Sequence, residues 1–293
     1  AKERTSIPRC SMPQLQADYR VTNNEEVNLG LSQEQAVTEA TRCLDCPDPQ
    51  CVTGCPVGIN IPGFIKNIER GEFGQAAEVL RETSALPAVC GRVCPQERQC
   101  ESKCIYNRMK KAPVAIGYLE RFAADAANAA AKGETSVAAG PTPDAVKVAV
   151  VGSGPAGLSF AGAMARLGYK VHVFEALHEI GGVLKYGIPE FRLPNSVVDV
   201  EIDSLRAQGV EFMPNCVIGK TLGYDDLMEM GFRGVFVGSG AGLPRFMGIP
   251  GENFVGVMSS NEYLTRVNLM GAGRPGWATP VIKGRRVAVI GGG

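Results

Sequence analysis

Eight of the ten cysteines in this chain lie in one window, residues 43–104. The stretch "CLDCPDPQCVTGCP", residues 43–56, holds four of them and ends in a proline. The stretch "CGRVCPQERQCESKC", residues 90–104, holds the other four. Cysteine sulfur binds zinc or iron–sulfur clusters in reducing compartments and forms disulfides in oxidising ones. The window therefore predicts a metal site or a disulfide framework, and the compartment and the spacing decide between them.

The ends and the charge of the chain limit its compartment and its partners. The first residues, "AKERTSIPRC", lack the apolar core of a signal peptide, and no run of about eighteen apolar residues occurs anywhere. We therefore expect a cytoplasmic protein without a membrane partner, in which thiols stay reduced and disulfides are the weaker alternative. The 30 Lys+Arg balance the 30 Asp+Glu, so no basic field would attract nucleic acid.

The spacing of the first four cysteines separates zinc from iron–sulfur chemistry. Zinc sites usually pair two Cys-x-x-Cys loops across a gap. Here Cys43, Cys46, Cys51 and Cys55 follow one another closely and end before Pro56. That pattern is typical of bacterial ferredoxins, in which the last cysteine, before proline, binds a second cluster. We interpret the window as ligands for iron–sulfur clusters, with zinc as the alternative, and eight cysteines suffice for two [4Fe-4S] clusters.

The segments around the cysteines have helical patterns. Ser32 has Gln35 three residues later, which is the signature of a helix start. Residues 61–80 place their large apolar side chains on one helical face, with a break at a glycine. We therefore predict a multidomain chain that begins with an α-helical iron–sulfur domain over residues 1–130. Residues 131–145 are rich in Gly, Pro, Thr and Ala, which predicts a linker.

After the linker the pattern changes to that of a dinucleotide-binding domain. "VKVAVVGSGPAGLSFAGAMARLGYKVHVFEA" reads as strand, glycine turn, helix and strand. Gly152 permits the turn, Gly154 lets the backbone approach a pyrophosphate, and Gly157 lets the helix pack on the strand. Glu175 ends the second strand, where an acid binds ribose hydroxyls and disfavours a 2′-phosphate. We predict an α/β doubly wound, Rossmann-like domain over residues 146–280 that binds FAD or NAD.

A second glycine motif decides between the two nucleotides. "RRVAVIGGG", residues 285–293, has the pattern of another strand that enters a glycine turn. We expect residues 281–293 to be the start of a truncated NAD(P)-binding domain. Two nucleotide sites in one polypeptide indicate one flavin and one nicotinamide, so the first site is assigned to FAD.

Several motifs in a fixed order resemble one family. The cysteine run, "LPAVCGRVCPQERQC", "AIGYLERFAADA", "VAVVGSGPAGL", "GGVLKYGIPEFRLP" and "VFVGSGAGLPRFMGIPGEN" are similar to the small (beta) subunit of NADPH-dependent glutamate synthase. Near relatives are the large subunit of the bifurcating NADH-dependent reduced ferredoxin:NADP oxidoreductase and the N-terminal half of dihydropyrimidine dehydrogenase. The resemblance extends from residue 25 to residue 293.

The resemblance implies an interleaved set of iron ligands. One [4Fe-4S] cluster would be bound by Cys43, Cys46, Cys51 and Cys104. The other would be bound by Cys55, Cys94, Cys100 and Glu120. Glu120 stands where dihydropyrimidine dehydrogenase has a glutamine ligand. If Glu120 does not bind iron, Cys90 is the alternative fourth ligand.

The resemblance also implies the residues that bind FAD. Residues on the pyrophosphate would be Gly152, Ser153, Gly154, Pro155, Ala156 and Gly157, with Glu175 on the ribose. Residues placed towards the isoalloxazine, the phosphates and the adenine would be Gly182, Val183, Arg192 and Ile218. Gly238 and Gly240 would close the site. No triad of a nucleophile, a base and an acid is evident, so no catalytic side chain is assigned.

These parts together imply electron transfer. Electrons would pass from NADPH through FAD and the clusters to a partner, either an FMN-containing large subunit that makes glutamate from glutamine and 2-oxoglutarate, or another electron-acceptor subunit. The alternatives are the bifurcating ferredoxin:NADP enzyme and a non-catalytic iron–sulfur interaction module.

Overall fold

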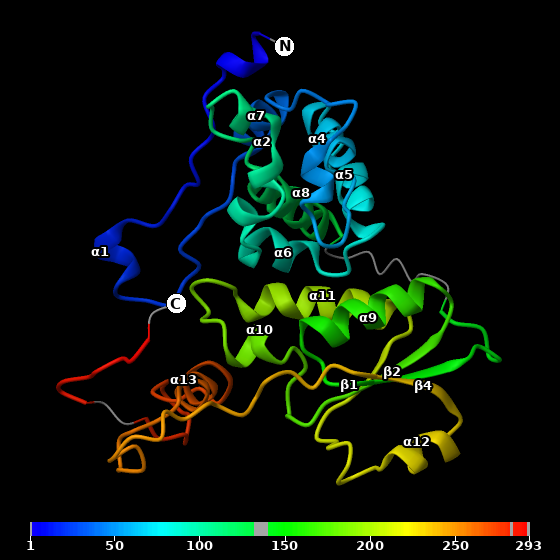
Figure 1. Ribbon diagram of the computed structural model, residues 1–293, viewed down its shortest axis with the longest axis vertical. Coiled ribbons are helices and arrows are strands. Elements are labelled where there is room, and N and C mark those ends of the chain that lie inside the picture. Colours follow the sequence, from blue (N-terminus) through cyan, green and yellow to red (C-terminus); the bar gives the residue numbers. More distant parts are fainter. Residues whose placement is uncertain (1, 132–139, 282–283, 292–293) are drawn as a thin grey trace.

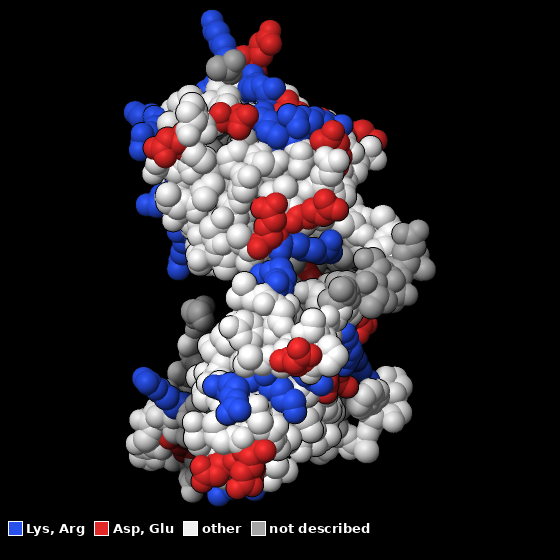
Figure 2. All heavy atoms as spheres, turned by 90° about the vertical axis from the view of Figure 1, so that its right-hand side faces the viewer, with Lys and Arg blue, Asp and Glu red and all other residues white. Residues whose placement is uncertain are grey.

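The computed structural model describes residues 2–131, 140–281 and 284–291 (Figure 1). Helices form the first part of the chain, and a parallel sheet with flanking helices forms the second (Figure 1). The predicted order of an α-helical domain followed by a doubly wound α/β domain is therefore confirmed. Acidic and basic side chains both occur over the face shown in Figure 2.

The helical domain contains longer helices and short turns. Its longer helices are α2 (Gln33–Thr41), α4 (Ile61–Glu69), α5 (Phe73–Arg81), α6 (Pro87–Val93) and α8 (Ile116–Ala130). The short ones are α1 (Ala17–Arg20), α3 (Gln50–Thr53), α7 (Ile105–Arg108) and 3-10 turns at Arg4–Ser6, Gln96–Arg98 and Glu101–Lys103. The predicted start of α2 is confirmed, because Ser32 and Gln35 form a reciprocal capping box.

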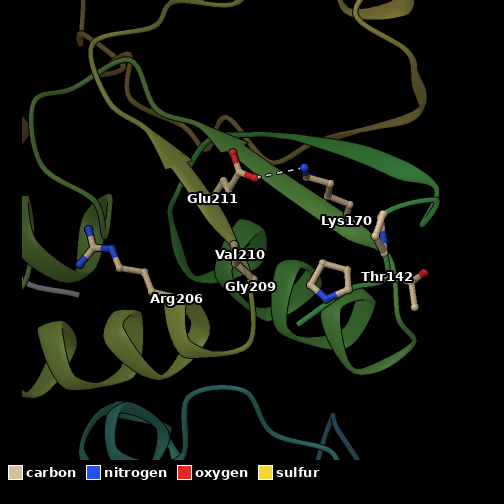
Figure 3. A pocket seen from close by; sticks show the side chains of 8 residues that line it. Thr142, Lys170, Arg206, Gly209, Val210 and Glu211 are labelled. Atoms are coloured by element: carbon tan, nitrogen blue, oxygen red, sulfur yellow. Dashed lines mark ion pairs between the residues drawn. The ribbon is translucent and has the colours of Figure 1, made fainter. Parts of the chain in front are cut away.

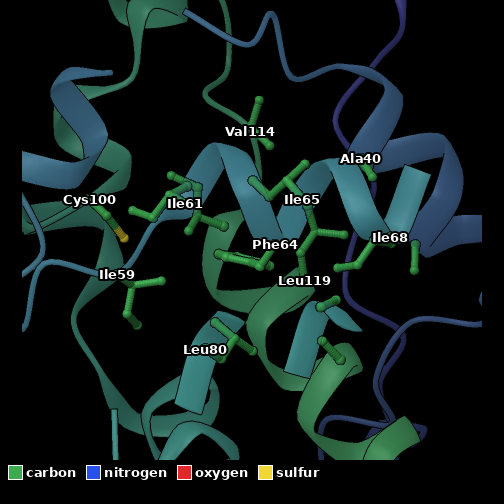
Figure 4. Close-up of a cluster of buried hydrophobic side chains, with 14 of the residues drawn as sticks. Ala40, Ile59, Ile61, Phe64, Ile65, Ile68, Leu80, Cys100, Val114 and Leu119 are labelled. Carbon is green, nitrogen blue, oxygen red and sulfur yellow. The ribbon is translucent and has the colours of Figure 1, made fainter. Parts of the chain in front are cut away.

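One apolar core holds these helices together. Ile61, Phe64, Ile65 and Ile68 recur at helical spacing on α4, and all four are buried. They meet Leu119 of α8 at the centre of the domain (Figure 4). The predicted break between α4 and α5 lies at a glycine with a φ of +80°, a conformation that only glycine adopts readily.

The second domain is built on a sheet of four parallel strands. They are β1 (Lys147–Val151), β2 (Lys170–Phe174), β3 (Glu211–Met213) and β4 (Phe232–Val237), in the order β3-β2-β1-β4. The helices are α9 (Pro155–Arg166), α10 (Val183–Tyr186), α11 (Asn195–Ala207), α12 (Tyr224–Glu229) and α13 (Ser260–Leu264), followed by a π-helical turn at Thr265–Leu269. In Figure 1, α9 and α11 lie on the side of the sheet nearer the helical domain, and α12 lies on the other.

Alternate strand residues supply the cores on the two faces of the sheet. Val150 and Val173 pack with the side chains of α9 and α11. Ala149 and Phe174 pack with Leu227 of α12 on the opposite face. Helices on both faces of a parallel sheet explain why its strands are almost entirely apolar.

Helix α6 belongs to both domains. Its residue Val89 and the preceding Leu86 are buried in the core of the dinucleotide-binding domain, together with Leu158 and Leu205. The same helix packs along α8 of the helical domain. A Cβ at Gly162 of α9 would lie only 2.7 Å from the Cβ of the residue that precedes Leu86, so the two domains are in close contact here.

Two expectations differ from the structure or lie outside it. Residues 285–290 form no strand within the described segment 284–291, although four consecutive apolar side chains follow the two arginines. A strand needs a neighbouring strand for its hydrogen bonds, and none of the described strands pairs with this segment. Most of the predicted linker, residues 132–139, lies outside the described residues. Among the helices that are described, none combines the length and the apolar character needed to cross a bilayer.

Candidate iron–sulfur and dinucleotide sites

Four cysteines from separate segments line one cavity in the helical domain. Cys43 and Cys46 lie in the loop after α2, Cys51 lies on α3, and Cys104 precedes α7. All four border a cavity of about 480 Å³. They are the cysteines that the resemblance assigns to one cluster, and the structure brings them together although Cys104 is far from the others in sequence.

Burial and positive charge define the environment of this cavity. Burial raises the pKa of Cys43, and burial together with the neighbouring thiol of Cys43 raises the pKa of Cys51 to about 12. The carbonyl of Cys43 accepts from Lys66 Nζ at 3.1 Å and from Arg4 Nη1 at 3.3 Å. Without a metal these thiols therefore keep their protons, so that iron binding has to release them, and the two cations would stabilise the negative charge that results.

The other cysteines gather near α8 and α6. Burial, together with the charges of Glu101, Glu120 and Cys55, raises the pKa of Cys100 to about 12. Burial raises the pKa of Glu120, and the charge of Cys94 raises it as well. Cys100 is therefore close enough to Glu120 and Cys55, and Glu120 to Cys94, for their charges to interact, and these four residues are the second set implied by the resemblance.

Glu120 has one property that is expected of an iron ligand. Its side chain is buried, and its Oε1 atom has no hydrogen-bond partner among the described residues. A buried carboxylate oxygen without a partner costs free energy unless a ligand satisfies it. The alternative ligand, Cys90, is already engaged: it lies beside Cys94, whose pKa it lowers to about 7, and it accepts from Ser84 Oγ at 4.0 Å.

The cysteine sets differ from a site for a single metal ion. Within the described residues, no three His, Cys, Asp or Glu side chains are placed to hold one metal ion. A [4Fe-4S] cluster binds each of its four ligands at a different iron. Its ligands therefore stand farther apart than those of a single ion, so cysteines that surround a cavity, as the first set does, suit a cluster better than a single ion.

The glycine turn after β1 has the geometry that the fingerprint predicts. A Cβ at Gly152, whose φ is +96°, would lie 2.5 Å from the carbonyl oxygen of Gly238. A Cβ at Gly157 would lie 1.9 Å from the carbonyl oxygen of Gly152, so no larger residue fits either position. Gly154 has an ordinary φ of −69° and open space beside it, and Pro155 and Ala156 follow as the first residues of α9. The free N–H groups of this helix start can face a pyrophosphate.

Glu175 follows β2 and is held by the glycine turn. Its Oε2 accepts from Ser153 N at 2.8 Å and from Ser153 Oγ at 2.6 Å, and its Oε1 accepts from Leu177 N at 2.8 Å. Ser153 Oγ accepts in turn from Gly181 N at 3.0 Å. Oε2 already accepts two hydrogen bonds, whereas Oε1 accepts one and can accept a further one, so the ribose role stays a prediction.

Only some of the remaining predicted cofactor residues lie beside the glycine turn. Gly182, with a φ of +54°, lies against the turn, because its Cβ would be 2.7 Å from the Cα of Gly154. Val183 begins α10 beside it, and Gly238 and Gly240 follow β4. Ile218 is half-buried against the core below the sheet, and Arg192 is exposed in the loop before α11. The turn, Glu175, Gly182 and Gly238 therefore form a compact group, whereas the structure gives Arg192 no described ion pair.

A further hollow lies at the amino ends of the strands, opposite the glycine turn. It measures about 340 Å³ and is bordered by Lys170 and Glu211, which begin β2 and β3 and lie 3.6 Å apart (Figure 3). The glycine turn is at the carboxyl ends of the strands, where parallel sheets bind their ligands. This hollow is therefore separate from the dinucleotide site.

The sequence interpretation missed Glu201. This residue lies on the apolar face of α11 and is only 2% exposed. Its Oε1 accepts from the N–H of Ala88 on α6 at 2.6 Å, and burial raises its pKa to about 7. The sequence did contain a signal for this contact. Glu201 shares the apolar stripe of its helix with Val198 and Ile202, and an acid within such a stripe needs a buried partner.

The helical domain carries the cysteine sets, and the second domain carries a dinucleotide turn. Together they define a class of oxidoreductase that moves electrons between a nucleotide cofactor and iron–sulfur clusters. Comparison with known families agrees with this class. Residues 20–132 match the family described as dihydropyrimidine dehydrogenase domain II, 4Fe-4S cluster. Residues 146–293, half of the chain, match the pyridine nucleotide-disulphide oxidoreductases, and the chain belongs to this family.

Named relatives extend the similarity over both domains. The glutamate synthase [NADPH] small chain of Escherichia coli (strain K12) is 36% identical over 98% of this chain and 61% of its own length. The same subunit of Halomonas elongata is 38% identical over 89% of this chain and 55% of its own length. The NAD-dependent dihydropyrimidine dehydrogenase subunit PreT of Escherichia coli O157:H7 is 41% identical over 72% of this chain and 51% of its own length.

These comparisons cover only part of the relatives. The chain spans about half to three fifths of the length of these curated relatives. Among solved structures, Mycobacterium tuberculosis FprA in complex with NADPH is 23% identical, with a TM-score of 0.37 over 42% of this chain and 28% of FprA. The resemblance to the glutamate synthase small subunit is confirmed by the named relatives.

Proposed function

We propose that this chain is part of an NADPH-dependent electron-transfer oxidoreductase of the glutamate synthase small-subunit type. It would bind FAD at the glycine turn and two [4Fe-4S] clusters in the helical domain, and it would pass electrons to a partner subunit with an FMN site. FAD accepts two electrons as a hydride from a nicotinamide and gives them up singly to clusters that carry one each.

The observation that carries this proposal is the position of α6. This helix bears Cys90, leads into Cys94, and packs its apolar side into the dinucleotide-binding domain. The cavity lined by Cys43, Cys46, Cys51 and Cys104 adjoins α7, at the end of the helical domain away from the sheet (Figure 1). The second set is therefore the nearer one to the glycine turn, and the first set is nearer the outside.

The residues of the chain have separate tasks in this scheme. The N–H groups at the start of α9 would bind the pyrophosphate, and Glu175 would hold the ribose while its bonds to Ser153 keep the turn rigid. The eight ligand side chains would hold the clusters. Lys66 and Arg4 would favour electron acceptance at the outer one, since they place positive charge beside Cys43.

The similarity to PreT favours a second candidate, an electron-transfer subunit of an NAD-dependent dihydropyrimidine dehydrogenase. The two candidates share the clusters and the flavin and differ in the nicotinamide and in the acceptor. The bifurcating ferredoxin:NADP enzyme, which the sequence resemblance also names, is a third candidate.

One experiment separates these candidates. The complete protein, loaded anaerobically with FAD and iron–sulfur clusters, is mixed with NADPH or NADH, and the cluster absorbance is followed. We expect bleaching by NADPH and, with a glutamate synthase large subunit, formation of glutamate from glutamine and 2-oxoglutarate. Bleaching by NADH alone, with a pyrimidine as the acceptor, would refute the glutamate synthase assignment.

A further inference from the structure

The residues before α2 form an extended N-terminal arm, and a short segment of this arm, residues 25–29, lies between the two domains. The N–H of Val27 donates to the carbonyl of Phe191 at 3.0 Å. Phe191 is in the loop between α10 and α11, shortly after Gly182, which itself lies against the glycine turn. The carbonyl of Val27 accepts from Leu15 N at 2.9 Å, so a second strand of the arm supports this segment. The arm is therefore bonded to the loop that follows the predicted flavin residues.

The other side of the same segment is bonded to α6 through Arg92. Nε and Nη2 of this buried guanidinium donate to the two carboxylate oxygens of Glu26, at 2.8 and 3.4 Å. Nη1 and Nη2 each donate to one oxygen of Asp125 at 2.8 Å, and Nη1 also donates to the carbonyl of Ala88 at 3.0 Å. All five N–H donors of the guanidinium are used, which fixes it in one orientation.

Arg121 on α8 completes the network. Its Nη1 lies 3.0 Å from Glu26 Oε1, and its Nη2 donates to the carbonyl of Asn28 at 2.8 Å. Its Nε lies 3.4 Å from Asp125 Oδ2. Two cations and two carboxylates balance here, and three of the four side chains are largely buried. Removing one carboxylate would leave a buried positive charge unpaired, which is strongly unfavourable.

The network adjoins the second set of cysteines. Arg92 stands between Cys90 and Cys94 on the chain, and Arg121 directly follows Glu120. The segment that holds these two arginines is thus the same one that holds the Phe191 loop. We propose that residues 25–29 form an interdomain strap, in which Glu26 is a positioning residue that fixes the flavin-binding loop relative to the second cluster. This inference depends on the proposed function for its flavin and its cluster.

The strap has a specific kinetic consequence. The described bonds of the strap reach the Phe191 loop, α6 and α8, and none of them reaches the turn that would bind the FAD pyrophosphate, so we expect hydride transfer to the flavin to continue without the strap. Electron transfer from the flavin to the nearer cluster depends on the distance and orientation that the strap fixes, and small misplacements of reacting groups can cost about 100-fold in rate. Loosening the strap should therefore slow the second step and leave the first unchanged.

The test uses the complete protein loaded with FAD and clusters. Glu26→Gln is compared with Glu25→Gln, a neighbour that is exposed and bonds only locally, to the hydroxyl of Tyr19 and, through its N–H, to Asn23. Stopped-flow absorbance after mixing with NADPH separates flavin reduction from cluster bleaching. In Glu26→Gln we expect an unchanged rate of flavin reduction and cluster bleaching slowed at least about tenfold, an effect within the range for misplaced groups. The Glu25→Gln control should match the wild type.

Two further variants keep the inference falsifiable if Glu26→Gln folds poorly. Val27→Pro removes the N–H that bonds to Phe191 without replacing any charged side chain, and it should give the same kinetic split. Glu26→Asp keeps the charge and should restore most of the bleaching rate. Wild-type bleaching rates in both Glu26→Gln and Val27→Pro would overturn the inference. Absence of bleaching in the wild-type protein would refute the proposed function instead.

Discussion

The Cα of Gly91 on α6 lies directly against the backbone of Arg121 on α8. A Cβ at this glycine would be 2.5 Å from the amide nitrogen of Arg121 and 2.7 Å from its Cα. The two helices therefore touch without a side chain between them. This close approach brings Cys94, which follows α6, beside Glu120 on α8, so that two segments of the chain can contribute to one site.

The first prediction concerns this contact. Gly91→Ala should destabilise the protein by about 1–3 kcal/mol, because backbone atoms of α8 would have to shift to make room for a methyl group. Chemical denaturation of the loaded protein measures the loss. Gly74→Ala is the matched control, since Gly74 is exposed on α5 with open space beside it, and alanine there should stabilise by about 0.5–1 kcal/mol. Equal stability of the two variants would mean that α6 and α8 are not in contact.

The second prediction concerns the metal content. Anaerobically purified protein should contain about eight irons and about eight acid-labile sulfides, because two four-iron clusters are expected. Cys46→Ser should lower both amounts, since Cys46 lines the first cavity. Cys216→Ser should leave them unchanged, because Cys216 is buried with the core below the sheet. Stoichiometric zinc without sulfide would contradict the iron–sulfur assignment.

The third prediction tests the ligand without sulfur. Glu120→Ala should change the EPR spectrum of one cluster and leave the other unchanged, because an oxygen ligand would be lost from a single iron. Glu97→Ala is the control, an exposed carboxylate between Cys94 and Cys100. If Glu120→Ala keeps the wild-type spectrum and Cys90→Ser alters it, Cys90 is the fourth ligand.

How far the sequence predicted the structure depends on the range of each interaction. The capping box of Ser32 and the glycine turn at Gly152 act over a few residues, and local spacing was sufficient to predict both. Glu201 meets Ala88 across 113 positions, and Arg92 meets Glu26 across 66. Periodicity shows that a face is buried but does not identify the helix that covers it. The grouping of the cysteines came from the family resemblance, since spacing alone allows several pairings.

The fourth prediction follows from the raised pKa of Glu201. Burial raises this pKa from 4.5 to about 7, so between these pH values the folded protein keeps a proton that the unfolded chain has lost. Stability should therefore fall as the pH rises from about 4.5 to 7, by about 3 kcal/mol at about 1.4 kcal/mol per pH unit. Glu201→Gln keeps an oxygen for the Ala88 N–H and does not titrate.

The measurement is the free energy of unfolding of both proteins as a function of pH. The stability of the wild type relative to Glu201→Gln should decline across this interval and then level off. Glu229→Gln, at the exposed end of α12, serves as the control and should follow the wild type. A constant difference between wild type and Glu201→Gln would show that the carboxyl group titrates in its ordinary range.

The last prediction concerns the flavin site and separates binding from folding. Gly154 has a φ of −69° that alanine adopts without strain, and a Cβ there would meet no atom of the chain within 4 Å. Gly154→Ala should therefore fold with wild-type stability. The same methyl group would occupy the space through which a pyrophosphate approaches the start of α9. FAD affinity in the complete protein should fall at least about tenfold, which corresponds to about 1.4 kcal/mol of lost contact. Calorimetric titration with FAD measures the change, with Gly74→Ala as the control. Unchanged affinity in Gly154→Ala would place the pyrophosphate away from this turn.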